Sequence, residues 1–243
     1  MRAVVVVPTY NERDNIGSLI EAVLMVPGEF DILVVDDSSP DGTAEVVTSY
    51  AEKTNRVHLL KRTGNRGFGP SYIDGFKYAI SHGYEAVFTM DADFSHDPQN
   101  LPDLAKALET HDVVMGSRYV GGKVSVVNWP LSRLILSVLG GKYVRLITGL
   151  KTYDPTGGFR AYRPYVLEGI GLDTLKSNGY SFLVETLFRA QRCGFSVAEI
   201  PIIFTERREG QSKMSKKIMF EAALMPWRLR LGRRRPPARK EDS

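Results

Sequence analysis

The sequence of 243 residues contains one cysteine, Cys193, and four histidines. A single thiol cannot close an intramolecular disulfide or build a cysteine-ligated zinc site, so the sequence indicates a reducing compartment. The amino terminus has four valines before Pro8, which is too short an apolar run for a signal peptide. The most apolar segment, residues 131–150, is interrupted by charged side chains and falls short of the ~20 uncharged residues that span a bilayer. We therefore expect a cytoplasmic protein that does not cross a membrane.

Two common nucleotide-binding motifs are also absent. The segment after the first expected strand, residues 8–12 (PTYNE), has neither the GxGxxG of dinucleotide-binding folds nor the Gly-Lys-Ser/Thr of a phosphate-binding loop. A nicotinamide dehydrogenase and a P-loop NTPase are therefore disfavoured. A nucleotidyltransferase is disfavoured for a similar reason, because it would carry a glycine-rich, basic signature near the first strand.

Basic residues are concentrated at the carboxyl end. Residues 206–243 hold 12 of the 32 Lys and Arg residues and 5 of the 28 Asp and Glu residues, so their net charge is +7 and that of residues 1–205 is −3. Such a tail is typical of contact with a polyanion, either nucleic acid or an anionic membrane surface. Nucleic acid is disfavoured, because Trp227 is the tail's one candidate for stacking on bases and the carboxylates of the body would repel phosphates. From residue 233 onward we expect disorder.

Short apolar, β-branched runs alternate with segments of helical spacing. This alternation predicts an α/β protein with a mostly parallel sheet and flanking helices, whose ligands bind beyond the carboxyl ends of the strands. Polar clusters follow three strands, at residues 8–12, 36–42 and 91–93, so we expect these three strand ends to form one site. The expected strands are residues 3–7, 32–35, 57–61, 86–90, 113–116 and 197–204; the expected helices lie near 16–23, 44–51, 101–108, 130–147 and 180–193, with a loop over 154–160.

The most distinctive polar cluster is Asp91-Ala92-Asp93, directly after the apolar strand that ends at Met90. A turn at this point can direct both carboxylates at one hard cation, such as Mg²⁺ or Mn²⁺. A divalent ion there could neutralise a diphosphate leaving group. Aspartates that follow strands also cap helices, so the pair by itself leaves both interpretations open.

The first two clusters suit a nucleoside. Tyr10 can stack on a base, while Glu12 and Asp37 can accept hydrogen bonds from ribose hydroxyls or base N–H groups. The same segments are expected to have structural roles as well: Asn11 is expected to cap a helix, and residues 38–42 are expected to form a turn. These roles are compatible with nucleoside binding.

Six segments together resemble one family. Over roughly residues 3–220 the sequence resembles glycosyltransferase family 2 and, within it, the polyprenyl (dolichyl) phosphate mannosyltransferases. The segments are residues 8–12 (PTYNE), 34–42 (VVDDSSPDG), 65–69 (NRGFG), 90–98 (MDADFSHDP), 116–119 (GSRY) and 158–160 (GFR).

The resemblance implies a GT-A-type fold, Mg²⁺ or Mn²⁺ as cofactor, and transfer of mannose with inversion from GDP-mannose to a polyprenyl phosphate. Metal ligation is implied for Asp91, Asp93 and Ser95. The last is a departure, because some relatives carry Gln where this chain has Ser95. The residues implied to bind the nucleotide sugar are Pro8, Tyr10, Glu12, Val35, Asp37, Asp91, Ala92, Asp93, Arg207 and Lys213.

The acceptor phosphate is implied to meet Arg118, Arg133 and Ser137, and a guanidinium fork suits a phosphate better than a point charge does. Arg207 and Lys213 match a segment that closes over the donor diphosphate. The catalytic set is therefore Asp93, Arg118, Arg133, Arg207 and Lys213.

A lipid phosphate is already an anionic nucleophile, so the reaction needs no activated Ser, Cys or His. We assign no general base; Asp93 and Glu185 are the arguable candidates, and Glu185 could equally brace arginines. His96 is expected at a helix start.

A lipid acceptor calls for a membrane surface. Residues 130–147 place Leu131, Leu134, Ile135, Val138 and Leu139 beside basic residues, as an interfacial helix would, although an ordinary core helix remains an alternative. Residues 215–231 carry two opposed apolar stripes, one with Met225 and Leu229 and the other with Leu224, Trp227 and Leu231, and Pro226 is expected to kink or divide that helix.

We therefore expect a catalytic domain over residues 1–215, an amphipathic helix over 216–232 that faces the membrane or a partner, and a basic tail over 233–243. The protein would lie peripherally on the cytoplasmic face of a membrane. Binding to a separate integral-membrane partner is a further possibility.

The donor has one alternative. A polyprenyl phosphate glucosyltransferase that uses UDP-glucose would share the fold and the mechanism. Residues 67–69 (GFG) look more like the mannosyl members, since glucosyl members often carry Lys between these glycines.

Overall fold

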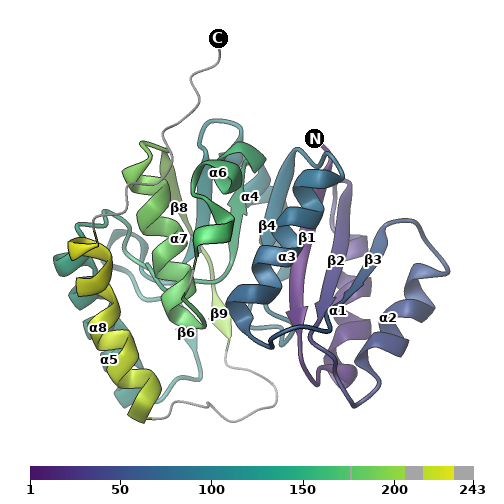
Figure 1. Ribbon diagram of the computed structural model, residues 1–243, viewed down its shortest axis with the longest axis horizontal. Helices are drawn as coiled ribbons and strands as arrows, with labels where there is room; N and C mark the ends of the chain where they lie inside the picture. Colours follow the sequence, from purple (N-terminus) through teal and green to yellow (C-terminus); the bar gives the residue numbers. More distant parts are fainter. Residues whose placement is uncertain (176, 206–215, 233–243) are drawn as a thin grey trace.

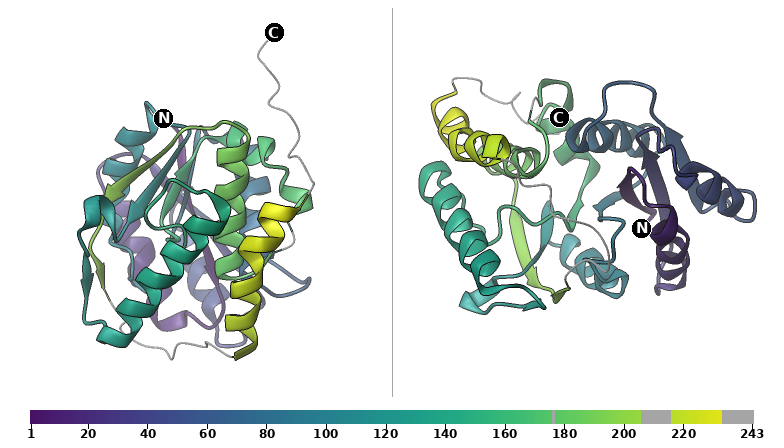
Figure 2. Two further views of the ribbon diagram at one scale, coloured as in Figure 1. Left: turned by 90° about the vertical axis from the view of Figure 1, so that its left-hand side faces the viewer. Right: turned by 90° about the horizontal axis from the view of Figure 1, so that it is seen from below.

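The computed structural model describes residues 1–175, 177–205 and 216–232. Seven strands form one sheet in the order β3-β2-β1-β4-β7-β5-β8, with helices on both faces (Figures 1 and 2). The strands are β1 (Ala3–Thr9), β2 (Phe30–Asp36), β3 (Val57–Lys61), β4 (Ala86–Thr89), β5 (Val113–Ser117), β7 (Arg160–Tyr162) and β8 (Val197–Pro201), and β6 (Val126–Val127) pairs with β9 (Phe204–Thr205) in a second, two-stranded sheet.

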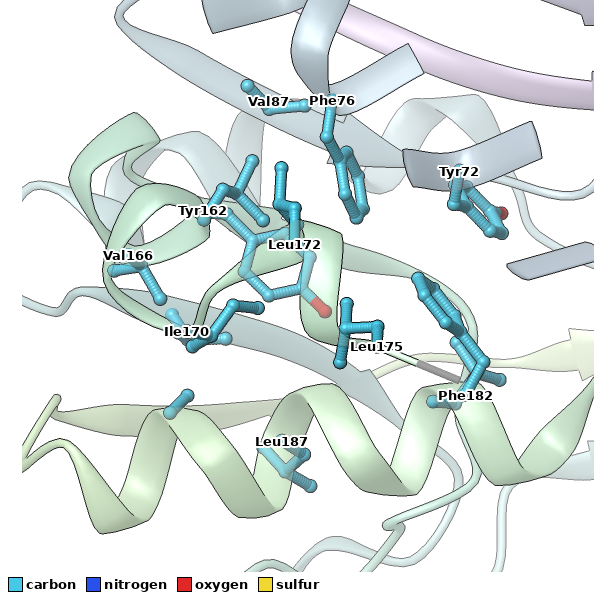
Figure 3. Packing of buried hydrophobic residues seen from close by; sticks show 14 of the residues in the cluster. Tyr72, Phe76, Val87, Tyr162, Val166, Ile170, Leu172, Leu175, Phe182 and Leu187 are labelled. Carbon is cyan, nitrogen blue, oxygen red and sulfur yellow. The ribbon is translucent and has the colours of Figure 1, made fainter. Parts of the chain in front are cut away.

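The two faces of the large sheet bury separate apolar clusters. One cluster joins the sheet to α1, α2 and α4, and the other joins it to α3, α6 and α7. Aromatic rings make up much of the second cluster: the rings of Tyr72 and Phe182 are stacked with centroids 6.0 Å apart (Figure 3). The helices are α1 (Arg13–Met25), α2 (Thr43–Ala51), α3 (Phe68–Ser81), α4 (Leu101–Leu108), α5 (Leu131–Thr148), α6 (Pro164–Gly169), α7 (Tyr180–Arg192) and α8 (Lys216–Leu231).

The predicted convergence of three strand ends is confirmed. β1 pairs in parallel with β2 on one side and with β4 on the other. The carboxyl ends of these strands therefore lie next to one another at one edge of the sheet, and each ends in one of the polar clusters.

The second half of the sheet differs from the expectation in two places. The expected loop over residues 154–160 is confirmed up to residue 159, but β7, which starts at Arg160 and runs antiparallel between β4 and β5, was not expected. The strand expected over residues 197–204 ends at Pro201, and Phe204–Thr205 pairs with β6 instead. Proline cannot donate to a strand ladder, which accounts for the break.

α3 is not among the helices expected from the sequence. The helix begins at Phe68 and crosses the sheet closely at Gly75. A Cβ at Gly75 would stand 2.4 Å from a methyl carbon of Val6, so a side chain there would force the helix off the sheet.

α8 lies against α5 and α7 (Figure 2). Arg230 Nη1 donates to the carbonyl of Ile147 at 3.0 Å, and Met225 is buried in the core. The helix runs without interruption from Lys216 to Leu231, so the expectation that Pro226 divides it is wrong. Across the described parts of the chain, we find no helix with both the length and the apolar character needed to span a bilayer.

Candidate active site

Each of the three loops at the strand ends contains a non-glycine residue in the left-handed region. The φ angles are 60° at Asn11, 57° at Ser38 and 59° at Phe94. Such conformations cost of order 1–3 kcal/mol each and tend to gather at functional sites. The N-cap residue of α1 is Glu12, so the expected cap at Asn11 is wrong, and Asn11 instead makes the sharp turn out of β1.

The two aspartates after β2 have different surroundings. Asp36 is buried and accepts hydrogen bonds from Thr9 Oγ1 and from the Oγ and backbone N–H of Ser39, so it fixes the loop. Asp37 is also buried, and its two oxygens accept hydrogen bonds from Arg62 Nη1 and from the N–H of Gly67. Asp37 thus holds the loops after β2 and β3 together at the predicted nucleoside site.

Arg62 is a residue that sequence reasoning missed. It follows β3 directly, and its guanidinium group also donates to Asp74 at 2.6 Å and to the carbonyl of Asn65 at 3.1 Å. A basic residue immediately after a strand of the same parallel sheet was the available signal.

Tyr10 is the exposed member of the predicted nucleoside set. Its hydroxyl accepts a hydrogen bond of 2.9 Å from Arg66 Nη1, and the Arg66 guanidinium lies 4.7 Å from the ring centroid. Pro8 and Val35 are register partners in β1 and β2, and the side chain of Val35 is buried in the core. Glu12 accepts a hydrogen bond from Asn15 at the start of α1.

The Asp91–Ser95 turn at the end of β4 brings together the predicted metal ligands. Asp93 is buried and accepts the N–H of Ser95 at 3.0 Å. Gly158 lies against Asp91, where a Cβ would stand 3.8 Å from both carboxylate oxygens. The Oγ of Ser95 is buried and has no hydrogen-bond partner among the described residues.

These residues fit a metal held jointly with a ligand. No group of three His, Cys, Asp or Glu side chains converges within residues 1–175, 177–205 and 216–232. Mg²⁺ keeps several waters and is bound through one or two carboxylates together with substrate phosphates. Two aspartates and the unpartnered hydroxyl of Ser95 are therefore a donor set for Mg²⁺ or Mn²⁺ that a diphosphate would complete.

His96 has a packing role rather than a place in a helix. Its Nδ1 accepts the N–H of Asp91 at 3.3 Å, and its ring stacks on Phe159 with centroids 5.1 Å apart. Burial lowers the pKa of His96, against the nearby carboxylates of Asp91 and Asp93 that raise it. The ring supports the turn that carries both aspartates.

Arg118 follows β5 and is held by a residue that sequence reasoning missed, Asp154. The Nε and Nη2 groups of Arg118 donate to the two carboxylate oxygens at 2.6 Å each, and Nη2 also reaches Thr156 Oγ1 at 3.0 Å. Burial alone would raise the pKa of Asp154, but Arg118 outweighs it and lowers that pKa. The predicted loop position of Asp154 gave no sign of this partner.

The remaining residues predicted for the acceptor phosphate lie beside Arg118. The guanidinium carbon of Arg133 is 4.2 Å from the ring centroid of Trp129, and that of Arg118 is 5.5 Å from the same centroid. Ser137 Oγ accepts a hydrogen bond of 2.8 Å from the hydroxyl of Tyr119. The structure thus brings Arg118, Arg133 and Ser137 into one cluster.

Glu185 braces an arginine, which was one of its two expected roles. It forms an ion pair with Arg189 on the same helix and accepts the N–H of Ser177. Arg207 and Lys213 lie outside the described residues, so their predicted roles stay predictions.

α5 and α8 present exposed apolar side chains on adjacent surfaces, which we call the outer face. Tyr143 Oη links the helices: it donates to the carbonyl of Ala223 and accepts from Trp227 Nε1 at 3.0 Å. Leu134 and Val138, expected with the exposed stripe, are half-buried instead. The outer face consists of Leu131, Ile135, Leu136, Leu139, Tyr143 and Leu146 on α5 and Leu224, Trp227 and Leu231 on α8.

Solved structures share this architecture. Glucosyl-3-phosphoglycerate synthase from Mycobacterium tuberculosis, in complex with Mn²⁺, UDP-glucose and phosphoglyceric acid, superposes with a TM-score of 0.65 at 18% identity and covers 93% of this chain and 79% of its own. The same synthase in complex with Mg²⁺ and UDP gives a TM-score of 0.61 at 19% identity, covering 94% and 76%. These likenesses establish a GT-A-type fold.

Curated relatives are closer in sequence. An undecaprenyl-phosphate mannosyltransferase from Micrococcus luteus is 44% identical over 225 residues, covering 92% of each protein. A polyprenol monophosphomannose synthase from Mycolicibacterium smegmatis is 43% identical over 240 residues, covering 96% of this chain and 90% of that protein. Residues 4–171 match the family model for glycosyl transferase family 2. The chain therefore belongs to glycosyl transferase family 2, and its relatives within that family include polyprenyl phosphate mannosyltransferases.

Proposed function

We propose that the protein transfers mannose, with inversion, from GDP-mannose to the phosphate of a polyprenyl lipid, giving polyprenyl phosphate mannose and GDP. The proposal rests mainly on the short distance between two sites of opposite charge, one acidic and one basic. Asp91 and Asp93 follow β4, and Arg118 follows β5, with only β7 between these strands. Neighbouring strands lie ~4.8 Å apart, so the two strand ends are separated by about 10 Å. A metal-held diphosphate sugar and a lipid phosphate can meet across that distance.

The loop over residues 154–158 connects the two sites. Asp154 holds Arg118 at one end of the loop, and Gly158 lies against Asp91 at the other. Arg160, fully buried, donates to the carbonyls of Pro155 and Gly157 and so fixes the loop backbone. This one segment would thus set the positions of both donor and acceptor. Holding two substrates in a fixed relative orientation is one way in which enzymes accelerate their reaction.

The chain's own residues divide the work between donor and acceptor. Tyr10, Glu12 and Asp37 would hold the nucleoside, with Tyr10 exposed for stacking. Asp91, Asp93 and the Ser95 hydroxyl would hold Mg²⁺ or Mn²⁺, which when bound neutralises charge on the leaving diphosphate. Arg207 and Lys213 are proposed to meet the same diphosphate.

Displacement requires no general base. The phosphate oxygen of the acceptor, already anionic, forms a bond to the anomeric carbon while the bond from that carbon to the diphosphate breaks. A single displacement inverts the configuration at that carbon. Arg118 and Arg133 would hold the attacking phosphate in line, and their positive charges reduce repulsion between two anionic substrates.

The outer face suits a lipid acceptor. Its exposed leucines on α5 lie on the same helix as Arg133, and Lys142, Arg228 and Arg230 are exposed nearby. Apolar side chains flanked by cations are typical of interfacial binding, with about 1 kcal/mol contributed per basic residue near an anionic surface. We infer a peripheral position on the cytoplasmic face of a membrane; attachment through a separate integral-membrane protein is the alternative.

The test is transfer of radiolabelled mannose from GDP-mannose to a polyprenyl phosphate in detergent, with and without Mg²⁺ or Mn²⁺. UDP-glucose is the control donor. Metal-dependent mannolipid is the expected product. Product from UDP-glucose alone would overturn the choice of sugar, and no lipid product from a folded protein that binds GDP would overturn the choice of acceptor.

A further inference from the structure

Among the described residues, the indole N–H of Trp129 is a buried donor without a hydrogen-bond acceptor. Nε1 makes no hydrogen bond to any part of the chain that the structure describes, although it is shielded from solvent. An indole nitrogen can only donate, and burying a donor unpaired costs about 1–3 kcal/mol. Native structures rarely leave such groups, so each one calls for an explanation.

The surroundings of Trp129 are cationic and well ordered by packing. Its ring has the guanidinium groups of Arg133 at 4.2 Å and Arg118 at 5.5 Å, and the ring of Phe204 packs edge-on with centroids 5.5 Å apart. Both cations lie within the distance at which an aromatic ring attracts them. Trp129 is therefore the common scaffold of two arginines, and Phe204 fixes its plane.

Arg118 cannot by itself present a full fork to a phosphate. Its Nε and Nη2 groups are committed to Asp154 and Thr156. A phosphate that enters this cluster has four or more lone pairs to satisfy and needs donors beyond Arg133. The indole N–H of Trp129, whose ring lies close to both guanidinium groups, is such a donor.

We propose that Trp129 is a binding residue for the acceptor phosphate, and that its Nε1–H donates to a phosphate oxygen held between Arg133 and Arg118. This inference rests on the proposed function, because it takes the anion to be the phosphate of the isoprenyl acceptor. The ring also keeps the two guanidinium groups near each other before the phosphate arrives.

Trp129→Phe removes the N–H donor and keeps a smaller aromatic ring beside both arginines. With a soluble isoprenyl monophosphate as acceptor, we expect the KM for the acceptor to rise about tenfold, as for a hydrogen bond to a charged group. The kcat and the affinity for GDP should stay near wild type. Tyr165→Phe, which removes a hydroxyl that donates to Asp112 far from this cluster, is the matched control.

The indole signals give a direct second measurement. The chain has two tryptophans, so an NMR spectrum of the labelled protein shows two indole N–H signals, and Trp129→Phe assigns them. Saturating isoprenyl monophosphate should move the Trp129 proton downfield. An unmoved signal, or a Trp129→Phe enzyme with unchanged acceptor KM, would overturn the inference while wild-type transfer continues. Absence of transfer by the wild type would instead contradict the proposed function.

Discussion

Asp154 binds Arg118 through two parallel hydrogen bonds of 2.6 Å, and its carboxylate also accepts the backbone N–H of Arg118 at 3.1 Å. Both side chains are buried. The pair fixes the direction of the guanidinium group at the end of β5. Arg118 is thus held in place by Asp154 before any ligand binds.

Replacing Asp154 with Asn should destabilise the protein strongly. The change leaves the Arg118 charge buried without its counter-ion, a loss of about 3–5 kcal/mol in the free energy of unfolding. Urea unfolding at pH 7 measures this loss. Asp173→Asn is the control, since Asp173 forms an exposed pair with Lys77 that is worth at most ~1 kcal/mol. Equal stability of the Asp154 variant and wild type would contradict the role of the pair.

The difference in the free energy of unfolding between wild type and Asp154→Asn should also depend on pH. Arg118 lowers the pKa of Asp154 in the folded protein, against burial that would raise it. A carboxyl whose folded pKa is lowered contributes stability above its unfolded pKa, about 3.9, and loses it as pH falls through the folded value. The two unfolding free energies should therefore differ fully at pH 6, begin to approach each other as the pH falls below ~3.9, and meet only below the lowered pKa of folded Asp154.

Asp93→Asn should abolish transfer and leave the fold intact. The residue lies beside Asp91 at the end of β4, and loss of one carboxylate weakens the hold on the metal and the diphosphate. We expect kcat to fall about 100-fold or more, in the range seen when one charge-stabilising group is removed. Asp97→Asn is the matched control, because Asp97 caps a short helix and Asn caps equally well. Near-normal turnover with an unchanged circular dichroism spectrum would remove Asp93 from the site.

Ser95→Ala tests whether Ser95 is a metal ligand or only a packing residue. The Oγ of Ser95 is buried without a described partner, so its removal should leave the melting temperature unchanged or raise it slightly. If the hydroxyl completes the metal site, the concentration of Mn²⁺ needed for half-maximal GDP binding should rise about tenfold or more. An unaltered Mn²⁺ requirement would leave Asp91 and Asp93 as the ligands from the chain.

Leu146→Glu on the outer face should weaken binding to anionic vesicles. The side chain is 83% exposed, so the folded protein loses little, while a leucine buried in lipid contributes about 1.5–3 kcal/mol. We expect at least a tenfold fall in vesicle affinity, measured by sedimentation, with unchanged transfer to a soluble isoprenyl monophosphate. Met25→Glu is the control, because Met25 is 82% exposed on α1. Equal loss in both variants would show that the outer face has no special part in binding.

The sequence allowed prediction of the strand ends, because a buried apolar run followed by polar residues is a local pattern. β7 could not be predicted, since Arg160-Ala-Tyr162 is short, does not alternate, and begins with an arginine that is fully buried. The side chain of Arg160 is satisfied by carbonyls of Pro155, Gly157 and Leu183, which only the folded chain brings together.

The resemblance to the family supplied the expected site residues but not their partners. Asp37 meets Arg62 and Arg118 meets Asp154 across 25 and 36 positions of the chain, and no local pattern encodes such pairs. The exposed stripe of α5 was predicted in part. Its true direction depends on which residues pack on α8, so Tyr143 and Leu146 were missed while Leu134 was wrongly included.

α8 contributes to both the core and the outer face: Met225 is buried in the core, while Trp227 and Leu231 belong to the outer face. A ligand that binds only the folded state stabilises it by an amount that grows with the ligand concentration relative to its Kd. Lipid bound to Trp227 and Leu231 would therefore also hold Met225 in place. Resistance to heat and to proteases would then depend on how much membrane is present, so the protein would last longer beside the proposed lipid acceptor than away from it.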